Sequence, residues 1–180
     1  AVVTDDVVGP LYLAALRRAR QPHAAAQDEF VLPAGEASKT WASLDRIVDA
    51  LLAAHFDRGS LLVALGGGVV GDLTGFAAAV YQRGIDFVQV PTTLLAMVDA
   101  SIGGKTAVDT PHGKNLVGAF HPPVAVIADL DTLQTLPTLE RINGLAEELK
   151  HGVFCDAAYF ALVAEANLGQ SDWHTLVARS

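Results

Sequence analysis

The sequence predicts an α/β fold in which a parallel, Rossmann-like sheet precedes a helical segment. Short apolar runs alternate with helical segments up to about residue 132, the order that a parallel sheet covered by helices requires. One of these runs, residues 61–65, leads directly into three consecutive glycines, and only helical segments follow residue 132. We therefore expect an α/β domain over residues 1–135 and the beginning of an all-helical domain over residues 136–180.

The apolar runs and their flanking turn residues predict the individual elements. We expect strands over residues 1–4, 27–32, 61–65, 86–90 and 124–128, the last of them buried. We expect helices over residues 10–20, 40–55, 69–82, 139–153 and 157–167, with one or two helical turns over 94–100. The polar, glycine-bearing segment 101–115 is predicted to be a long loop, and a loop of that length in a compact domain is usually functional.

Composition restricts the class of protein. The 180 residues are 51% hydrophobic and 18% charged, which is typical of a globular chain, and the net charge of −8 argues against nucleic acid and anionic membranes as partners. No apolar run reaches the roughly 18 residues of a membrane span. Cys155 is the single cysteine, which fits a reducing, cytoplasmic compartment, and we expect it to be a small buried residue. The start, AVVTDDVVGP, lacks the basic region of a signal peptide and is typical of a segment already inside a fold.

The glycines after residues 61–65 form the pattern Gly66-x-Gly68-x-x-Gly71 at a predicted strand-to-helix turn. Glycines let backbone N–H groups approach a ligand there, and a helix N-terminus favours an anion such as a pyrophosphate. A dinucleotide-binding unit also has an acidic residue at the end of the next strand, about 20 residues later, where this chain has Gln89-Val90-Pro91. The pattern therefore leaves two interpretations open, a nucleotide site and a packing turn.

A basic and amide cluster lies in the predicted loop of this otherwise acidic chain. Lys105, Lys114 and Asn115 suit a phosphate or a carboxylate, although solvated surface residues would show the same pattern. The sequence around Lys105 also resembles the end of a phosphate-binding P-loop. The leading glycine of that motif would have to be at position 99, which is aspartate, so we reject it.

Glu147, Lys150 and His151 share one predicted helix. Glu147 and His151 are four residues apart, so both could face one metal ion. Two ligands do not make a site, and the same spacing fits a surface pair.

Taken together, four blocks resemble the 3-dehydroquinate synthase family of sugar-phosphate cyclases. They are LGGGVVGDLTGFAAAVYQRG (65–84), VPTTLLAMVDASIGGKTAVD (90–109), GKNLVGAFHPP (113–123) and NGLAEELKHG (143–152). The resemblance covers nearly the whole chain. It implies that earlier and later residues of the family are missing here.

The resemblance implies a reaction of the shikimate route to aromatic amino acids. In that reaction 3-deoxy-D-arabino-heptulosonate 7-phosphate becomes 3-dehydroquinate, with transient oxidation by NAD+, elimination of phosphate and a divalent metal, zinc or cobalt, at the oxidised hydroxyl. Two alternatives remain open. The chain could belong to another sugar-phosphate cyclase, such as a 2-deoxy-scyllo-inosose synthase, or it could be an NAD-binding fragment without catalysis.

Carried over by position, the resemblance implies which residues contact the nucleotide. They are Asp5 at the adenosine ribose, Glu36 and Lys39 in the loop 34–39, Gly68, Val69, Val70, Gly71 and Asp72 at the pyrophosphate turn, Thr92 and Thr93, Lys105 and Lys114, and Thr132 and Thr135. This assignment supplies the missing acidic residue from an earlier strand.

The resemblance also implies the catalytic and metal-binding groups. The polar groups around the sugar acid phosphate are Asp99, Lys105, Asn115, Lys150 and Arg83, with Arg83 acting from the neighbouring subunit of a homodimer. Glu147 is implied to be the first metal ligand, and two histidines beyond position 180 complete the set. His151 stands where relatives often have tyrosine and is not predicted to be a ligand.

Overall fold

The computed structural model describes residues 1–20, 28–166 and 172–180. Within these ranges the chain forms a five-stranded, all-parallel sheet in the order β2-β1-β3-β4-β7. The strands are β1 (Val2–Asp5), β2 (Glu29–Leu32), β3 (Leu61–Gly66), β4 (Asp86–Pro91) and β7 (Ala125–Val126). The α/β prediction is confirmed. The predicted second strand begins at Gln27, which lies outside the described residues.

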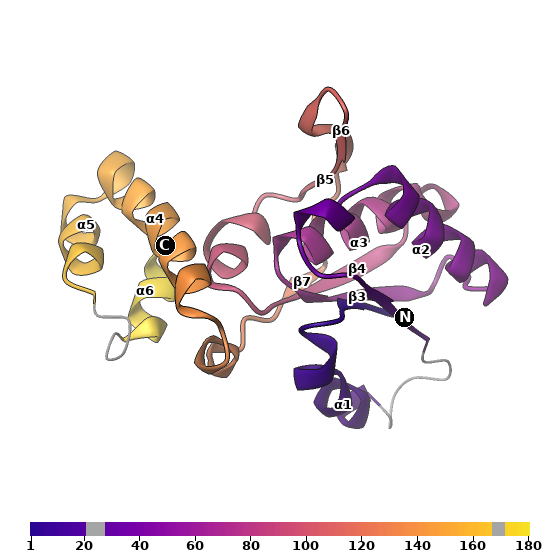
Figure 1. Cartoon of the computed structure of the whole chain (residues 1–180), viewed down its shortest axis with the longest axis horizontal. Coiled ribbons are helices and arrows are strands. Elements are labelled where there is room, and N and C mark those ends of the chain that lie inside the picture. Colours follow the sequence, from indigo (N-terminus) through magenta and orange to yellow (C-terminus); the bar gives the residue numbers. More distant parts are fainter. Residues whose placement is uncertain (21–27, 167–171) are drawn as a thin grey trace.

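Helices cover both faces of the sheet (Figure 1). Helix α1 (Gly9–Arg20) packs Tyr12, Leu13 and Leu16 on one face. On the opposite face, α2 (Trp41–Ala53) and α3 (Gly68–Val80) pack against β1 and β3 in the largest apolar core. The predicted apolar stripe of α2 is buried there at Leu44, Ile47 and Leu51, with Val48 partly buried. This helix begins after Thr40, whose hydroxyl accepts a hydrogen bond from the Ser43 backbone N–H at 3.2 Å.

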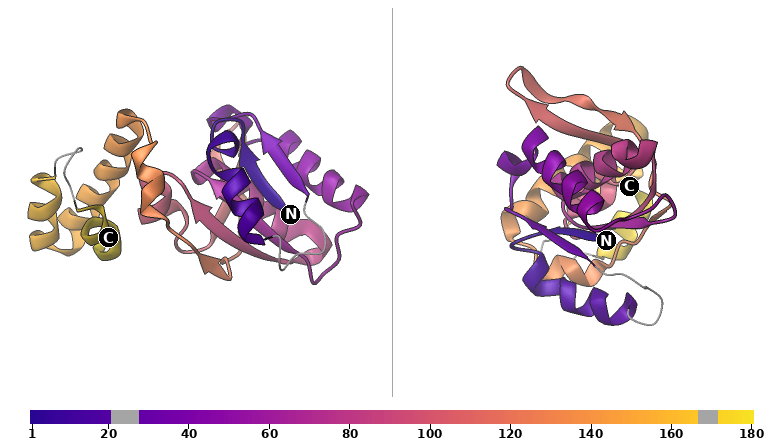
Figure 2. Two further views of the ribbon diagram at one scale, coloured as in Figure 1. Left: turned by 90° about the horizontal axis from the view of Figure 1, so that it is seen from below. Right: turned by 90° about the vertical axis from the view of Figure 1, so that its right-hand side faces the viewer.

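The prediction of a long loop over residues 101–115 is wrong, because most of this segment belongs to an antiparallel hairpin. Strands β5 (Lys105–Thr110) and β6 (Gly113–Phe120) pair from Lys105–Phe120 to Thr110–Gly113, and the hairpin projects from the sheet on the side of α3 (Figures 1 and 2). Thr106, Ala107 and Val108 are all buried, so β5 lacks the apolar–polar alternation that would have revealed a strand. At its root the His121 ring stacks on Phe87, with centroids 5.6 Å apart.

Two expectations of burial are also wrong. The predicted buried strand at 124–128 is the two-residue strand β7, and Val124, Val126 and Ile127 are exposed because this strand lies at the edge of the sheet. Cys155 is exposed as well, at the last residue of its helix. In β7 and at Cys155, the apolar character of the residues therefore did not indicate that they are buried.

The C-terminal part is helical, as predicted. It consists of α4 (Thr138–Cys155), α5 (Ala157–Ala164) and α6 (Trp173–Arg179), which stand beside one end of the α/β part (Figure 2). The predicted end of the middle helix at Asn167 lies outside the described residues. Four short helical segments complete the fold: η1 (Glu36–Ser38), η2 (Tyr81–Arg83), η3 (Ala96–Ala100) and η4 (Leu130–Gln134). Among the described helices, none is both long and apolar enough to traverse a lipid bilayer.

An ionisable side chain lies inside the helical part. Glu148 of α4 is 0% exposed, and neither carboxylate oxygen has a hydrogen-bond partner among the described residues. Burial raises the pKa of this carboxyl from 4.5 to about 7, because the charged form loses its hydration, and the neighbouring Tyr159 hydroxyl opposes only part of that rise. The folded state therefore holds a proton on Glu148 over a pH range in which the unfolded chain has released it.

This shift predicts a pH-dependent stability. Since the folded pKa is raised, the contribution of Glu148 is fully present below pH 4.5 and is lost as the pH rises towards 7. Glu148→Gln should remove that loss, so the variant should gain about 3 kcal/mol over the wild type between pH 4 and 8. Urea unfolding at stepped pH would measure the difference, with Glu165→Gln as an exposed carboxylate control. Parallel pH profiles for wild type and Glu148→Gln would contradict the prediction.

Candidate functional site

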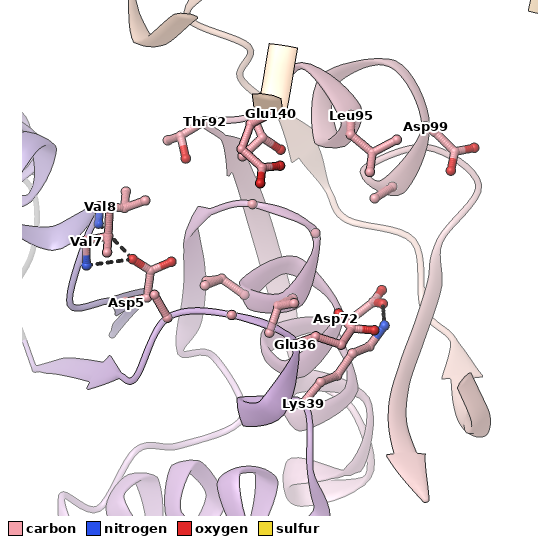
Figure 3. Close-up of a pocket in the computed structure, with 18 of the residues that line it drawn as sticks. Asp5, Val7, Val8, Glu36, Lys39, Asp72, Thr92, Leu95, Asp99 and Glu140 are labelled. Carbon is pink, nitrogen blue, oxygen red and sulfur yellow. Dashed lines mark hydrogen bonds and ion pairs between the residues drawn. The ribbon is translucent and has the colours of Figure 1, made fainter. Parts of the chain in front are cut away.

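A cavity of about 1040 Å³ opens where β1, β3 and β4 end. Ligands of parallel α/β sheets bind at this edge, because the loops that follow the strands meet there. Figure 3 shows its walls: Asp5 is the last residue of β1, Glu36 begins η1, Lys39 directly follows η1, and Thr92 directly follows β4. The size suits a ligand larger than a simple sugar.

The glycine turn forms the floor of this cavity. Strand β3 ends at Gly66 and α3 begins at Gly68, so the first-turn N–H groups of α3 point towards the cavity without a capping side chain at Gly67. A Cβ on Gly66 would lie 2.7 Å from Cγ2 and 2.8 Å from Cβ of Val70, which makes that glycine a packing requirement. At Gly68 the nearest contact would be the Ala100 Cβ at 3.3 Å. The turn is therefore both a tightly packed turn and an anion-binding helix start that faces the cavity, the two interpretations that the sequence pattern left open.

Asp5 is held in one orientation at the cavity wall. Its Oδ1 accepts hydrogen bonds from the backbone N–H groups of Val7 at 2.9 Å and Val8 at 2.7 Å (Figure 3). The next residue, Asp6, accepts a hydrogen bond from the Ala34 N–H at 2.8 Å and so ties the loop after β2 to the end of β1. A fixed carboxylate at this edge can accept hydrogen bonds from ligand hydroxyls.

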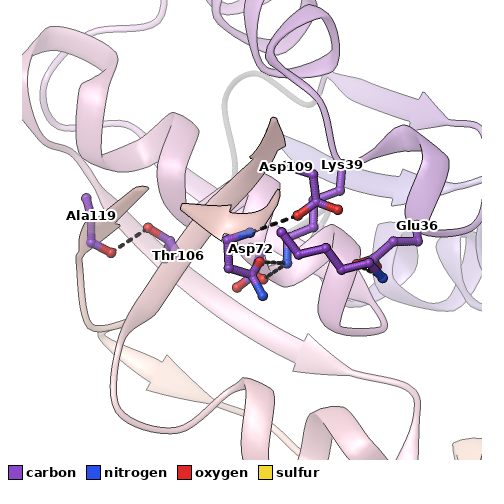
Figure 4. Close-up of polar contacts among 8 residues, drawn as sticks. Glu36, Lys39, Asp72, Thr106, Asp109 and Ala119 are labelled. Atoms are coloured by element: carbon purple, nitrogen blue, oxygen red, sulfur yellow. Dashed lines mark hydrogen bonds and ion pairs between the residues drawn. The ribbon is translucent and has the colours of Figure 1, made fainter. Parts of the chain in front are cut away.

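A buried cation lies on the other side of the cavity. Lys39 is 4% exposed and forms an ion pair with Asp72 of α3 (Figure 4). It also donates a hydrogen bond to Oδ1 of Asn115 at 2.5 Å. Burial raises the pKa of the Asp72 carboxyl, and the Lys39 ammonium opposes that rise. Lys114, by contrast, forms an exposed ion pair with Glu36 at 2.9 Å.

The hairpin contributes the wall beside Lys39. Lys105, Asn115 and Phe120 line the cavity from its two strands. The Thr106 hydroxyl donates to the Ala119 carbonyl at 2.8 Å, which joins the strands close to this wall (Figure 4). Because the Lys105 side chain is exposed, its ammonium is available to an anionic ligand.

Three potential metal ligands come together next to the cavity. Asp99, Glu147 and His151 each offer one ligand atom, and these atoms all lie within 4.8 Å of one another. Nε2 of His151 is 4.0 Å from Oε1 of Glu147, and the Lys150 ammonium forms an ion pair with the same carboxylate. Two ligands of a tetrahedral zinc ion with bonds of about 2.1 Å lie about 3.4 Å apart, so small side-chain rotations would close the set.

The structure brings most of the predicted site residues to one cavity. Those that line it are Asp5, Glu36, Lys39, Gly68, Val69, Val70, Asp72, Thr92, Thr93, Asp99, Lys105, Asn115 and Thr135. Those that do not line it are Gly71, Lys114, Thr132, Arg83, Glu147 and Lys150. Glu147 reaches it indirectly, because Asp99 belongs both to the cavity and to the set of metal ligands. Arg83 is exposed before the start of β4, away from the edge at which the cavity opens.

Tyr12 and Glu140 are among the polar residues of the cavity that sequence reasoning missed. The Tyr12 hydroxyl donates to the Thr132 carbonyl at 3.3 Å and also contacts the Thr135 hydroxyl, so it links α1 to η4 across the cavity. Glu140 lies in the first turn of α4 and points towards the cavity near Thr92 in Figure 3. Neither residue is part of a local motif, and only the packing of α1 and α4 beside the sheet edge reveals them.

Comparison with known proteins gives consistent results. The family model described as 3-dehydroquinate synthase N-terminal matches residues 29–143. The 3-dehydroquinate synthases of Neisseria meningitidis serogroup C (strain 053442) and serogroup A are each 52% identical over 160 residues, 89% of this chain. The match covers 45% of each of those proteins, so the chain spans about half the length of the curated relatives it matches.

Solved structures share the fold. A 2-epi-5-epi-valiolone synthase from Streptomyces hygroscopicus, with NAD+ and Zn²⁺ bound, is 34% identical with a TM-score of 0.90, covering 99% of this chain and 52% of its own. A 2-deoxy-scyllo-inosose synthase complexed with carbaglucose-6-phosphate, NAD+ and Co²⁺ is 31% identical with a TM-score of 0.79, covering 83% and 41%. A glycerol dehydrogenase from Schizosaccharomyces pombe, 19% identical with a TM-score of 0.64 over 84% and 36%, shares the fold alone.

Proposed function

Since the chain belongs to the 3-dehydroquinate synthase family, we propose that its cavity binds NAD+ and a phosphorylated seven-carbon sugar acid, 3-deoxy-D-arabino-heptulosonate 7-phosphate, for conversion to 3-dehydroquinate. The observation that carries the proposal is a single cavity that joins the glycine turn, the exposed Lys105 and Asp99 of the metal-ligand set. In this proposal residues 1–135 form the nucleotide-binding domain, and residues 136–180 begin a helical, metal-binding domain.

The nucleotide would lie along the edge of the sheet. The N–H groups at the start of α3 would receive the pyrophosphate, since Gly67 and Gly68 bring no side chain into that space. Asp5 would accept hydrogen bonds from the adenosine ribose, and Thr92 and Thr93 would contact the nucleotide from the end of β4. When bound, NAD+ supplies a hydride acceptor for a substrate hydroxyl.

The sugar acid phosphate would lie against the hairpin. Lys105 would neutralise the phosphate, whose negative charge grows as it leaves, and Asn115 would donate hydrogen bonds to the substrate. Arg83 lies outside the cavity of its own chain, so we propose that it acts in the neighbouring subunit of a homodimer. Lys150 would contact the substrate once the Glu147 carboxylate binds a metal ion.

The residues next to the cavity fit a divalent metal ion. Glu147 was expected to be a ligand, and it lies together with Asp99 and with His151, which was not expected to be one. The three provide two carboxylates and an imidazole, ligands that zinc and cobalt accept. A bound ion would lower the pKa of a coordinated hydroxyl and polarise the carbonyl formed from it. The Lys150 ammonium would have to move away from Glu147, because the ammonium and the metal ion would bind the same carboxylate.

A chimera would test the proposed reaction. Residues 1–180 would be joined to the part of the Neisseria meningitidis serogroup C relative that follows the matched region. We expect phosphate release from 3-deoxy-D-arabino-heptulosonate 7-phosphate that depends on NAD+ and zinc. Release from glucose 6-phosphate instead would favour another sugar-phosphate cyclase. A folded chimera that turns over neither substrate, while the 180-residue chain binds NAD+ in calorimetry, would reduce the proposal to a nucleotide-binding module.

The glycine turn makes a separate prediction. Gly68→Val should weaken NAD+ binding to the 180-residue chain by at least about a hundredfold, because its side chain would occupy the space of the pyrophosphate. Isothermal titration calorimetry would measure the affinity. Gly59→Val, in a surface turn where a Cβ meets only Asp57 Oδ1 at 3.5 Å, is the matched control. Equal NAD+ affinity in both variants would rule out the proposed cradle.

The metal-ligand set makes another prediction. Glu147→Gln should lower the affinity of the chain for Co²⁺ by at least about tenfold, since an amide is a poorer ligand than a carboxylate. The visible absorption of Co²⁺ would follow binding without any turnover. Glu165→Gln, an exposed carboxylate at the end of α5, should bind as the wild type does. A spectrum insensitive to Glu147→Gln would place the ion elsewhere.

A further inference from the structure

Lys39 connects three segments that are distant in the sequence. Its ammonium pairs with Asp72 of α3 and donates to Asn115 of β6, while its own carbonyl accepts a hydrogen bond from the Asp109 N–H of β5 at 2.8 Å. The side chain is nearly completely buried although it borders the cavity. Figure 4 shows Lys39, Asp72 and Asp109 converging beside the hairpin.

The ammonium of Lys39 is largely occupied by the protein. A lysine has three N–H donors, and two of them serve Asp72 and Asn115. Moving Lys39 towards a nucleotide would leave the Asp72 carboxylate, already destabilised by burial, without its partner. These contacts therefore favour a structural role, in which Lys39 binds other residues of the protein, over direct contact of Lys39 with the nucleotide.

These contacts determine how Asn115 presents its amide. Asn115 has a left-handed φ of 57°, which asparagine tolerates better than most residues, and its N–H donates to Oδ1 of Asp109 at 3.0 Å. An ammonium can only donate, so the atom facing Lys39 is the amide oxygen, and the NH₂ group is left for another acceptor. Asn115 lines the cavity, where such an acceptor would be a ligand oxygen.

We propose that Lys39 is a positioning residue, which holds the amide of Asn115 so that its NH₂ group faces the substrate. The ion pair with Asp72 anchors Lys39 to the nucleotide-binding helix, and the Asn115 hydrogen bond extends this anchor to the hairpin. Lys39 thereby sets the distance between the nucleotide and substrate walls of the cavity. The inference rests on the proposed function for the identity of the substrate, but not for the contacts.

Hydrogen exchange on the 180-residue chain tests the anchoring without turnover. In Lys39→Met the amides of Asp109 and Asn115 should exchange at least about tenfold faster, because the hairpin loses a buried hydrogen bond. Lys39→Arg should restore part of the protection, and Arg17→Met, which removes a cation from the exposed pair with Glu29, should leave it unchanged. Unaltered exchange in Lys39→Met would overturn the proposal.

Lys39→Met could prevent folding by leaving Asp72 buried and unpaired. The double variant Lys39→Met/Asp72→Asn removes both charges and should show the same faster exchange at Asp109 and Asn115. Protection equal to that of the wild type in this folded double variant would overturn the proposal equally.

Kinetics of the chimera separate positioning from nucleotide binding. Lys39→Met and Asn115→Ala should each raise the substrate KM about tenfold, with little change in the Kd of NAD+, and their combination should do no more than either alone. A loss of NAD+ affinity in Lys39→Met but not in Asn115→Ala would overturn the proposal. If the unsubstituted chimera shows no turnover, the proposed function fails, and hydrogen exchange alone decides the role of Lys39.

Discussion

The close approach of α3 to the strands around it is the constraint on which the cavity depends. A Cβ on Gly75 would lie 2.4 Å from Cγ2 of Thr106 and 2.9 Å from the Phe87 ring, so the helix can lie between β4 and the hairpin only without that side chain. This packing places β5 against the middle of α3, and residues of the hairpin line the same cavity as the first turn of that helix. A helix N-terminus that can bind an anion and a wall that carries cations thus share one cavity.

The ion pair of Lys39 and Asp72 stabilises that arrangement where two charged groups lose their hydration. Removing one partner of a buried ion pair typically costs about 3–5 kcal/mol, since the other charge is left without compensation. The raised pKa of Asp72 reflects the same cost of burial. Because Asn115 and Asp109 also bond to Lys39, the η1 segment, α3 and the hairpin are held together in one network. We infer that the main effect of these polar contacts is to fix the relative positions of the cavity walls, more than to stabilise the fold.

The metal-ligand set depends on a different junction, between the sheet and the helical part. Asp99 lies in η3, whereas Glu147 and His151 lie on α4. An apolar cluster that includes Leu94 and Met97, with Leu145 of α4 packed against it, holds these segments together. A Cβ on Gly144 would lie 2.5 Å from Leu94, which lies two residues before η3, so α4 can pack this closely there only because residue 144 has no side chain. The position of α4 therefore decides whether the three ligands can share an ion.

Local patterns were enough to predict the parallel strands, the glycine turn at the start of α3 and the shared helix face of Glu147 and His151, because each depends on neighbours within a few residues. Most of the site residues that the family resemblance indicated do line the cavity. Tertiary contacts alone decided that residues 105–120 form a hairpin, that Val126 and Cys155 are exposed, and that Lys39 is buried against Asp72 and Asn115. Burial and ion pairing join segments 30 to 80 residues apart, and no local periodicity records which of them will meet.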